Sequence, residues 1–242
     1  TFAVYGVVTS VPSATSFTFA GTTTGSSTAS TAIASGIGGF KLESCLLAAG
    51  VQTGPSQTLT IRKSGSGANP ILTHGVGTTA NADGVFVIQG ADNVTIDGID
   101  IQEPASNTTA TTRAEWAYAV LKCDGSNGSN DVTIQNCNIA LTKAYTSNYG
   151  VYVAGHGYDN VGVGYNVTTV TGTAQASRNK ALIQNNNINN VYQPIRLNGN
   201  PSSIATTGES LNDSLHAIIN NTLTNWAGSS TGATGIYYAN NR

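Results

Sequence analysis

The residues of this sequence that could carry chemistry are isolated acids in polar segments, a histidine between two glycines and an arginine in an apolar run. Enzymes that hydrolyse glycosidic bonds generally use two carboxyl groups that flank the scissile bond. Glu115, Asp124 and Asp159 could supply the carboxyl groups, and His156 or Arg196 a base or a positive charge, if the fold gathers them in one groove. These five residues form the candidate catalytic set.

A second set of residues could bind a ligand. Arg196 and Lys122 lie in two copies of one short apolar phrase, so they could form a basic strip for an acidic glycan on a sheet face. Tyr152, Tyr192 and Tyr237 lie in or beside the same phrase. Exposed tyrosines on a sheet stack on sugar rings or contact other proteins. We predict these five as ligand-binding candidates, while a solubilising role for the cations and a core role for some tyrosines stay open.

One polar segment could hold a metal ion. Residues 124–131 carry Asp124 and Asp131 together with Asn and Ser oxygens, which are ligand types that Ca²⁺ prefers. The bidentate Glu of a dedicated calcium loop is missing, and a Gly/Asn/Ser turn accounts for the same composition equally well. We therefore expect no cofactor, with Ca²⁺ at Asp124 and Asp131 as the open alternative.

The charge content excludes two classes of partner. Charged residues make up only 9% of the chain, with 10 Lys and Arg against 12 Asp and Glu. Without a basic cluster, this balance argues against a nucleic-acid partner. No apolar run approaches the ~20 residues that a membrane-spanning helix needs. We therefore expect neither nucleic-acid binding nor membrane insertion.

The three cysteines are Cys45, Cys123 and Cys137, an odd number that prevents full pairing within the chain. Cys137 takes the place that an isoleucine takes in another copy of a repeated phrase, so we expect a buried free thiol. A Cys123–Cys137 disulfide is the alternative, if these two residues belong to neighbouring turns.

The elements that must position all these side chains are set by an internal repeat. An eight-residue phrase occurs at residues 94–101, 132–139, 181–188 and 216–223, and its matched isoleucines are separated by 38, 49 and 35 residues. A recurring apolar phrase indicates a solenoid whose turns stack on one another. An antiparallel sandwich also has many short strands, but it has no reason to repeat the same octet.

Each copy predicts two short strands and a bend. Apolar and polar residues alternate as in strands, and Gly98, Asn136, Asn185 and Asn220 interrupt the copies at one place. Gly and Asn tolerate left-handed backbone geometry, so this column marks the bend, and its asparagines could hydrogen-bond up the stack. A further strand phrase recurs at residues 84–90, 118–123, 150–155, 194–199 and 235–240. The predicted fold class is therefore all-β, a parallel β-helix with loop inserts at its corners.

We predict a single domain over residues 1–242, with an N-terminal strand, loop and cap in 1–50 and the turns in 51–242. Apolar residues between 38 and 50 have helical spacing, which predicts a short capping helix there. No cap-like segment follows residues 235–240. We therefore expect a fragment of a longer protein, or an open end that meets further domains or other copies of the chain.

Several phrases together resemble a known group. Residues 40–47, 59–65, 67–70 and 94–99 are similar to segments of the large right-handed parallel β-helix proteins that Bacteroidetes secrete, many of them substrates of type IX secretion. The resemblance implies a right-handed β-helix of the pectate-lyase-like class and a secreted or cell-surface location. It leaves the activity open, because function must be argued from site residues rather than from fold.

The expected function follows from the low charge and from the lack of a carboxylate constellation. We expect a non-catalytic extracellular structural or adhesive module, which could self-assemble through its open end. The alternatives are a polysaccharide lyase or glycoside hydrolase acting on an acidic glycan, and a carbohydrate-binding module. Convergence of the candidate acids with His156 or Arg196 would favour the enzyme.

Overall fold

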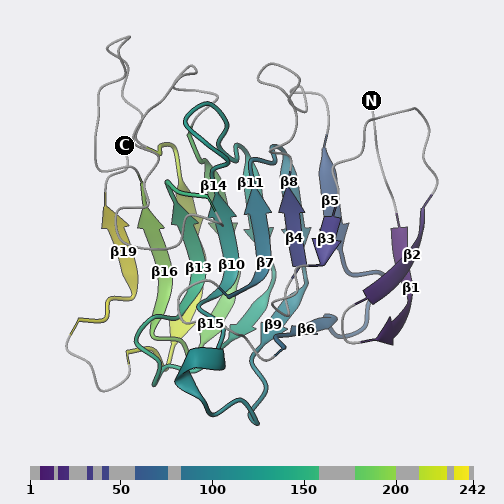
Figure 1. The fold of residues 1–242 in the computed structure, drawn as a ribbon, viewed down its shortest axis with the longest axis horizontal. Coiled ribbons are helices and arrows are strands. Elements are labelled where there is room, and N and C mark those ends of the chain that lie inside the picture. The colour runs from purple at the N-terminus through teal and green to yellow at the C-terminus, as the bar shows by residue number, and fades with distance from the viewer. Residues whose placement is uncertain are drawn as a thin grey trace.

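The computed structural model describes residues 6–13, 16–21, 32–34, 40–43, 58–75, 83–157, 178–199, 213–227 and 232–239. Nearly all of its regular elements are strands (Figure 1), and the one helix in these ranges is the short 3-10 helix η1 (Ala110–Thr112). No helix within the described ranges is long and apolar enough to cross a bilayer.

Three sheets carry the fold. Sheet 1 has the spatial order β19 (Ile236–Ala239), β16 (Gln193–Asn198), β13 (Tyr149–Ala154), β10 (Trp116–Leu121), β7 (Gly84–Gln89), β4 (Phe40–Glu43) and β3 (Ala32–Ala34). Sheet 2 contains β17 (Ala217–Ile219), β14 (Ala181–Gln184), β11 (Val132–Gln135), β8 (Val94–Asp97) and β5 (Leu59–Arg62). Sheet 3 contains β18 (Thr222–Thr224), β15 (Asn187–Asn189), β12 (Asn138–Ala140), β9 (Asp100–Gln102) and β6 (Ile71–Thr73).

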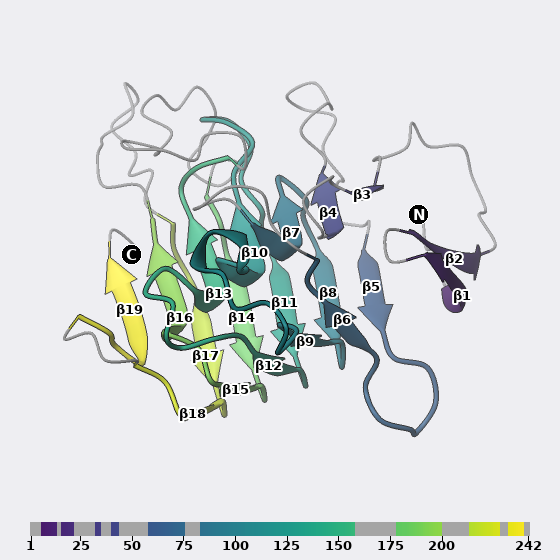
Figure 2. The same ribbon diagram turned by 60° about the horizontal axis from the view of Figure 1, so that its bottom comes forward.

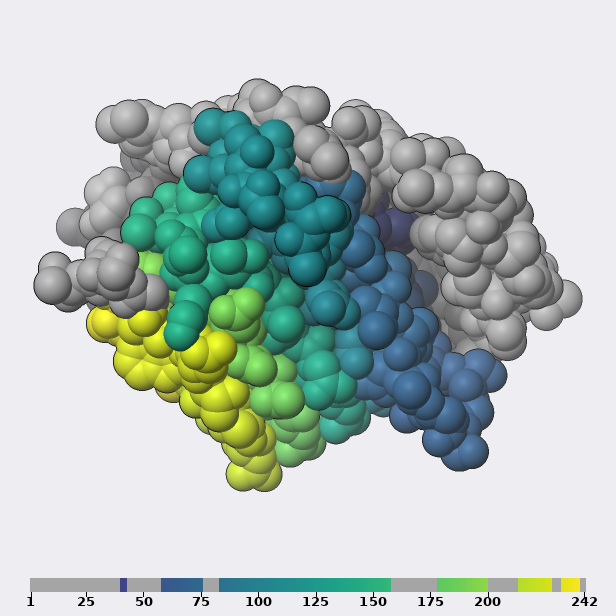
Figure 3. Space-filling view, turned by 90° about the horizontal axis from the view of Figure 1, so that it is seen from below, coloured from purple at the N-terminus to yellow at the C-terminus, as the bar shows by residue number. Residues whose placement is uncertain are grey.

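From β4 onward the chain visits sheets 1, 2 and 3 in turn, and each new strand pairs in parallel with the strand one turn earlier. Within each sheet the strands of successive turns stack along one common axis (Figure 2). The turns appear as adjacent coloured bands in Figure 3. Antiparallel pairs in the described ranges are β3 with β4 and β1 (Gly6–Ser13) with β2 (Ser16–Gly21). The prediction of an all-β chain of stacked parallel sheets is confirmed, and the arrangement is consistent with a parallel β-helix.

The core is built from rows of aliphatic side chains that repeat at one position per turn. In sheet 2, Ile96, Ile134 and Ile183 are in register and fully buried. In sheet 3, Ile139 and Ile188 are in register and buried in the same cluster. Because every turn places its apolar residues above those of the previous turn, each turn removes its neighbour's core from water, which is the main stabilising term.

The corner between sheets 2 and 3 is a two-residue bend in four turns. The first residues of these four bends form the predicted column, and all four have positive φ: Gly98 +68°, Asn136 +57°, Asn185 +55° and Asn220 +52°. The predicted bend is therefore confirmed. The asparagine ladder, however, lies one position further along. The backbone N–H of Asn186 donates to Asn221 Oδ1 (3.0 Å), because Asn185 and Asn220 are exposed whereas the residue after each is more buried.

The predicted N-terminal capping helix is wrong for the part that the structure describes. Residues 40–43 form strand β4, parallel to β7, and residues 44–50 lie outside the described ranges. Leu42 is buried in the core in register with Ile88, and the ring centroids of Phe40 and Phe86 are 4.7 Å apart. Alternation over four residues and pairing with a neighbouring strand thus outweigh the longer helical spacing.

The structure distinguishes between the two predictions for Cys137, a buried free thiol and a disulfide with Cys123. Cys137 is a buried free thiol, as predicted, and burial raises its pKa. Cys123 is disulfide-bonded to a partner outside the described ranges. The alternative prediction of a Cys123–Cys137 disulfide is therefore wrong.

Candidate functional site

The outer face of sheet 1 carries a row of side chains in register across five strands. Val87, Ala119, Tyr152, Arg196 and Tyr237 align from β7 to β19. On β7, β10, β13 and β16 the residues on either side of this row belong to the main core, whereas Val87, Ala119 and Tyr152 form a separate apolar cluster with Trp116. Since side chains alternate between the two faces of a strand, this second cluster marks the outer face.

Aromatic rings cross this face as a continuous stack. The rings of Trp116 and Tyr152 are stacked with centroids 5.0 Å apart and planes 17° apart. Tyr149 stacks on Tyr152 at 5.3 Å and 21°. Arg196 extends the series, with its guanidinium carbon 5.0 Å from the centroid of Tyr149 and 4.5 Å from that of Tyr237. We call Trp116, Tyr152, Tyr149, Arg196 and Tyr237 the aromatic–arginine stack.

Arg196 is a half-buried cation without a carboxylate partner in the described part of the chain. Its Nη1 donates one hydrogen bond to Gln193 Oε1 (3.3 Å), and its guanidinium carbon lies over the rings of Tyr149 and Tyr237. Cation–π contacts hold the guanidinium in place but use none of its N–H groups. The planar fork of a guanidinium suits the oxygens of an oxyanion.

His156 folds over the same face, but both of its ring nitrogens are engaged. Nε2 lies 2.8 Å from the hydroxyl of Tyr152, and Nδ1 lies 2.9 Å from the carbonyl oxygen of Gly157. Burial lowers the pKa of the imidazole, and the bond to Gly157 offsets this in part. A neutral ring that donates from Nδ1 and accepts the tyrosine proton at Nε2 satisfies both contacts. His156 therefore holds Tyr152 in position.

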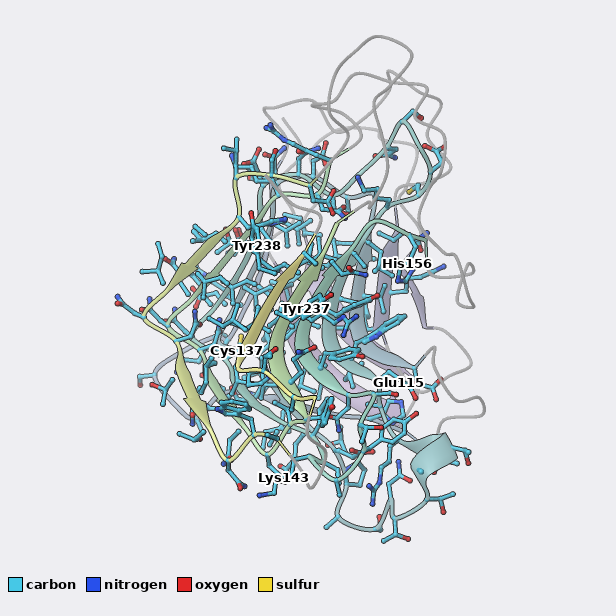
Figure 4. The ribbon with its side chains drawn as sticks, turned by 90° about the vertical axis from the view of Figure 1, so that its left-hand side faces the viewer. Glu115, Cys137, Lys143, His156, Tyr237 and Tyr238 are labelled. Atoms are coloured by element: carbon cyan, nitrogen blue, oxygen red, sulfur yellow. The ribbon has the colours of Figure 1, made fainter. Side chains whose placement is uncertain are left out.

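The predicted acids do not meet His156 or Arg196 to form a catalytic pair. Glu115 is buried before β10, where its Oε2 accepts the backbone N–H of Asp83 (2.8 Å) and its Oε1 accepts the hydroxyl of Tyr145 (2.7 Å). Figure 4 places Glu115 and His156 near opposite ends of the strands of sheet 1. Asp124 lies in an exposed turn, and Asp159 lies outside the described residues.

The corner that holds Glu115 contains a second buried acid. Asp83 is fully buried, and neither side-chain oxygen has a hydrogen-bond partner. Burial and, second, the charge of Glu115 raise the pKa of Asp83 to about 7. Asp83 therefore carries its proton through much of the acidic range.

The prediction that Lys122 lies beside Arg196 on a sheet face is wrong. Lys122 is buried, and its Nζ forms an ion pair with Asp213 Oδ1 at 2.7 Å. The backbone N–H of Asn179 donates to the same oxygen (2.8 Å) and its Nδ2 to Asp213 Oδ2 (3.0 Å). Lys122 follows β10 directly, where the chain leaves the sheet, so its side chain does not continue the outer row. It is a structural residue.

Tyr192 lies buried at the corner before β16, where its backbone N–H donates to Asn148 Oδ1 (2.7 Å). Tyr152 is also buried, within the aromatic–arginine stack, and Tyr237 is half-buried at the last turn. Of the three predicted ligand-binding tyrosines, Tyr152 and Tyr237 thus join Arg196 on one face, and Tyr192 supports that face from its edge.

The calcium candidates have other partners. Asp124 Oδ1 accepts the backbone N–H groups of Ser126 (2.7 Å) and Asn127 (3.0 Å), which is the geometry of an Asx turn. Asp131 Oδ1 pairs with Lys180 Nζ at 2.5 Å. In the described ranges no group of three or more His, Cys, Asp or Glu residues could hold a metal ion.

The arrangement presents hydrogen-bond donors rather than open ring faces. The rings of the stack contact one another's faces, and the Tyr152 hydroxyl is already hydrogen-bonded to His156. The groups that could serve a ligand are therefore the Arg196 N–H groups and the hydroxyls of Tyr149 and Tyr237. Such a set suits carboxylate, sulfate or phosphate oxygens. Sequence reasoning missed Trp116 and Tyr149, although Trp116 lies two residues before one copy of the apolar phrase and Tyr149 directly before another.

No protein family model matches this chain, and neither the curated proteins nor the solved structures include a match to it.

Proposed function

We propose that this protein is a right-handed parallel β-helix that acts as a non-catalytic adhesive module and binds an acidic glycan on the outer face of sheet 1. The observation that supports the proposal most strongly is the environment of Arg196. A guanidinium held between Tyr149 and Tyr237, with donors free of any carboxylate in the described ranges, offers a fixed site for a sugar acid.

The cations along the outer row support this choice of ligand. Lys41, at the opposite end of the outer row, is a second cation on the sheet, while Val87 and Ala119 between them are uncharged. Described acids near this face, such as Glu115, are buried and already hydrogen-bonded. An anionic polymer lying across the strands would meet the positive charge of Arg196.

The right-handed winding is part of the proposal. Parallel crossover connections are right-handed in about 98% of cases because of strand twist, and the repeated order of sheets 1, 2 and 3 fits that rule. A secreted or cell-surface location and kinship with the Bacteroidetes proteins are proposed too. The disulfide at Cys123 supports an oxidising compartment.

The non-catalytic role is supported by the state of the candidate acids and base. His156 is hydrogen-bonded through both nitrogens, and Glu115 through both oxygens. A general base needs a free site within reach of the proton that it takes. Neither residue offers one.

The test is calorimetric binding of an acidic polymer, polygalacturonate, and of a neutral one, dextran, to the wild type and to Arg196→Ala. We expect polygalacturonate alone to bind, and Arg196→Ala to weaken binding by about 1.5–3 kcal/mol, which is typical for a charged hydrogen bond. Arg62→Ala is the matched control, since Arg62 is exposed on sheet 2 and its loss changes the net charge equally. Equal weakening by both variants, or equal binding of dextran, would exclude a defined site at Arg196. Release of shortened oligosaccharides would favour the enzyme instead.

A further inference from the structure

The corner between the ends of the sheet 1 strands and the starts of the sheet 2 strands contains a buried amine, a buried amide and a buried carboxylate. Lys122 directly follows β10, Asn179 lies two residues before β14, and Asp213 lies four residues before β17. All three residues are at most 1% exposed. They are far apart in the sequence, so the stacking of the turns is what brings them together.

One carboxylate contacts both of the other groups. Asp213 Oδ1 lies 2.7 Å from Lys122 Nζ and accepts the backbone N–H of Asn179 at 2.8 Å. Asp213 Oδ2 accepts the side-chain amide N–H of Asn179 at 3.0 Å. The amine and the amide thus lie at the two oxygens of one carboxyl group. A rotation of the flexible lysine chain is the movement that brings Nζ to Cγ of Asn179, because reacting atoms must approach to about 3–3.5 Å.

The side-chain amide of Asn179 has the partners that a nucleophilic attack on it needs. Its Oδ1 accepts the backbone N–H of Ser129 at 2.9 Å. Negative charge develops on this oxygen when a nucleophile adds to the amide carbon, and a fixed donor stabilises that charge. Its Nδ2 donates to the carbonyl oxygen of Ala154 at 2.7 Å and to Asp213. Both ends of the amide are therefore fixed within the corner.

The burial of the ion pair prepares the amine. Transfer of one proton from Lys122 to Asp213 converts two charged groups into two neutral ones, which removes the cost of keeping charges away from water. An uncharged lysine amine is a nucleophile. The corner thus contains a nucleophile, an acceptor for its proton and a polarised amide.

We propose that Lys122 and Asn179 form an isopeptide bond in the folded chain, with Asp213 as the proton carrier. Lys122 Nζ gives one proton to Asp213 and forms a bond to Asn179 Cγ. The bond from Cγ to Nδ2 breaks, and Nδ2 takes a second proton from the amine through the carboxyl group and leaves as ammonia. One amide replaces another, so the step needs no oxidant, reductant or energy-rich donor.

The isopeptide bond closes residues 122–179 into a covalent ring that contains β11, β12 and β13. Force on the ends of the chain cannot extend this segment, whereas the turns outside the ring stay free to unravel. The bond does not depend on glycan binding, because none of its three residues belongs to the outer row of sheet 1.

The intact mass of the purified, folded chain, measured after reduction of its disulfide, tests the isopeptide bond. The mass should be lower than that of the sequence by one ammonia molecule. Trypsin should then give a peptide of residues 114–143, uncut after Lys122, that carries the dipeptide of Asn179 and Lys180. A folded wild type with the full mass would overturn the proposal. Loss of one water molecule, with Lys122 joined to Asp213, would overturn the assignment of Asn179.

Lys122→Arg keeps the positive charge beside Asp213 but replaces the amine with a guanidinium, which stays protonated, so this variant should have the full mass of its sequence. Lys180→Arg is the matched control, because Lys180 pairs with the exposed Asp131, and it should still lose ammonia. Circular dichroism establishes that each variant is folded. An ammonia loss that persists in folded Lys122→Arg would overturn the proposal. If Lys122→Arg does not fold, the linked peptide of the wild type decides by its presence or absence.

Discussion

Two ion pairs, Lys122–Asp213 and Lys180–Asp131, should differ several-fold in energy, because one is buried and the other partly exposed. Lys122 Nζ and Asp213 Oδ1 are 2.7 Å apart, and the side chains are 1% and 0% exposed. Lys180 and Asp131 are 2.5 Å apart, but their side chains are 33% and 51% exposed. Removing one partner of a buried pair leaves an uncompensated charge and costs about 3–5 kcal/mol. Exposed pairs contribute about 0–1 kcal/mol.

Lys122→Met keeps most of the side-chain volume and removes the charge, so it should lower the free energy of unfolding by about 3–5 kcal/mol. Lys180→Met, the matched control, should lower it by less than about 1 kcal/mol. Urea unfolding at pH 7, followed by circular dichroism, measures both. The double variant Lys122→Met, Asp213→Asn should recover part of the loss, because the remaining amide is neutral. Equal small losses in both single variants would refute the argument that burial decides the energy of the pair.

Two further predictions concern burial and close packing. Asp83 has a pKa raised to about 7 by burial and by Glu115, so its contribution to stability is present below the ordinary pKa of about 4 and is lost as the pH rises through 7. Asp83→Asn removes this pH dependence, so the melting temperature of the variant minus that of the wild type should be larger at pH 8 than at pH 5. An equal difference at the two pH values would contradict the raised pKa of Asp83. A Cβ at Gly150 would lie 2.6 Å from the carbonyl oxygen of Pro194, so Gly150→Ala should cost about 1–3 kcal/mol in urea unfolding. Gly67→Ala, with no atom within 4 Å of its added Cβ, should cost far less, and similar losses would show that the contact is not the cause.

Much of the fold could be predicted because the repeat is local. Strand alternation and the column from Gly98 to Asn220 need only a few consecutive residues, and the structure has strands and positive φ angles at those places. The position of the asparagine ladder could not be read in the same way. It depends on which bend residue turns inward, and Asn185 and Asn186 are identical in type.

The site was predicted only in part, because it depends on register between distant strands. Arg196, Tyr152 and Tyr237 were recognised within one phrase, and the structure aligns them on one face. Lys122 was misplaced because its partner Asp213 lies in another turn, and nothing near Lys122 in the sequence indicates that contact. The helix expected around residue 40 failed for the same reason, since pairing with β7 decides that segment.

The two-residue bends between sheets 2 and 3 divide the molecule into a side of fixed length and sides of variable length. Adding one residue at Asn136 would shift the following strand by one position and turn its buried Ile139 toward water. The connection from β9 to β10, by contrast, already accommodates residues 103–115 without disturbing the register of its neighbours. Foreign peptides could therefore be grafted at the latter corner, and length changes during evolution should accumulate there and not at the bends.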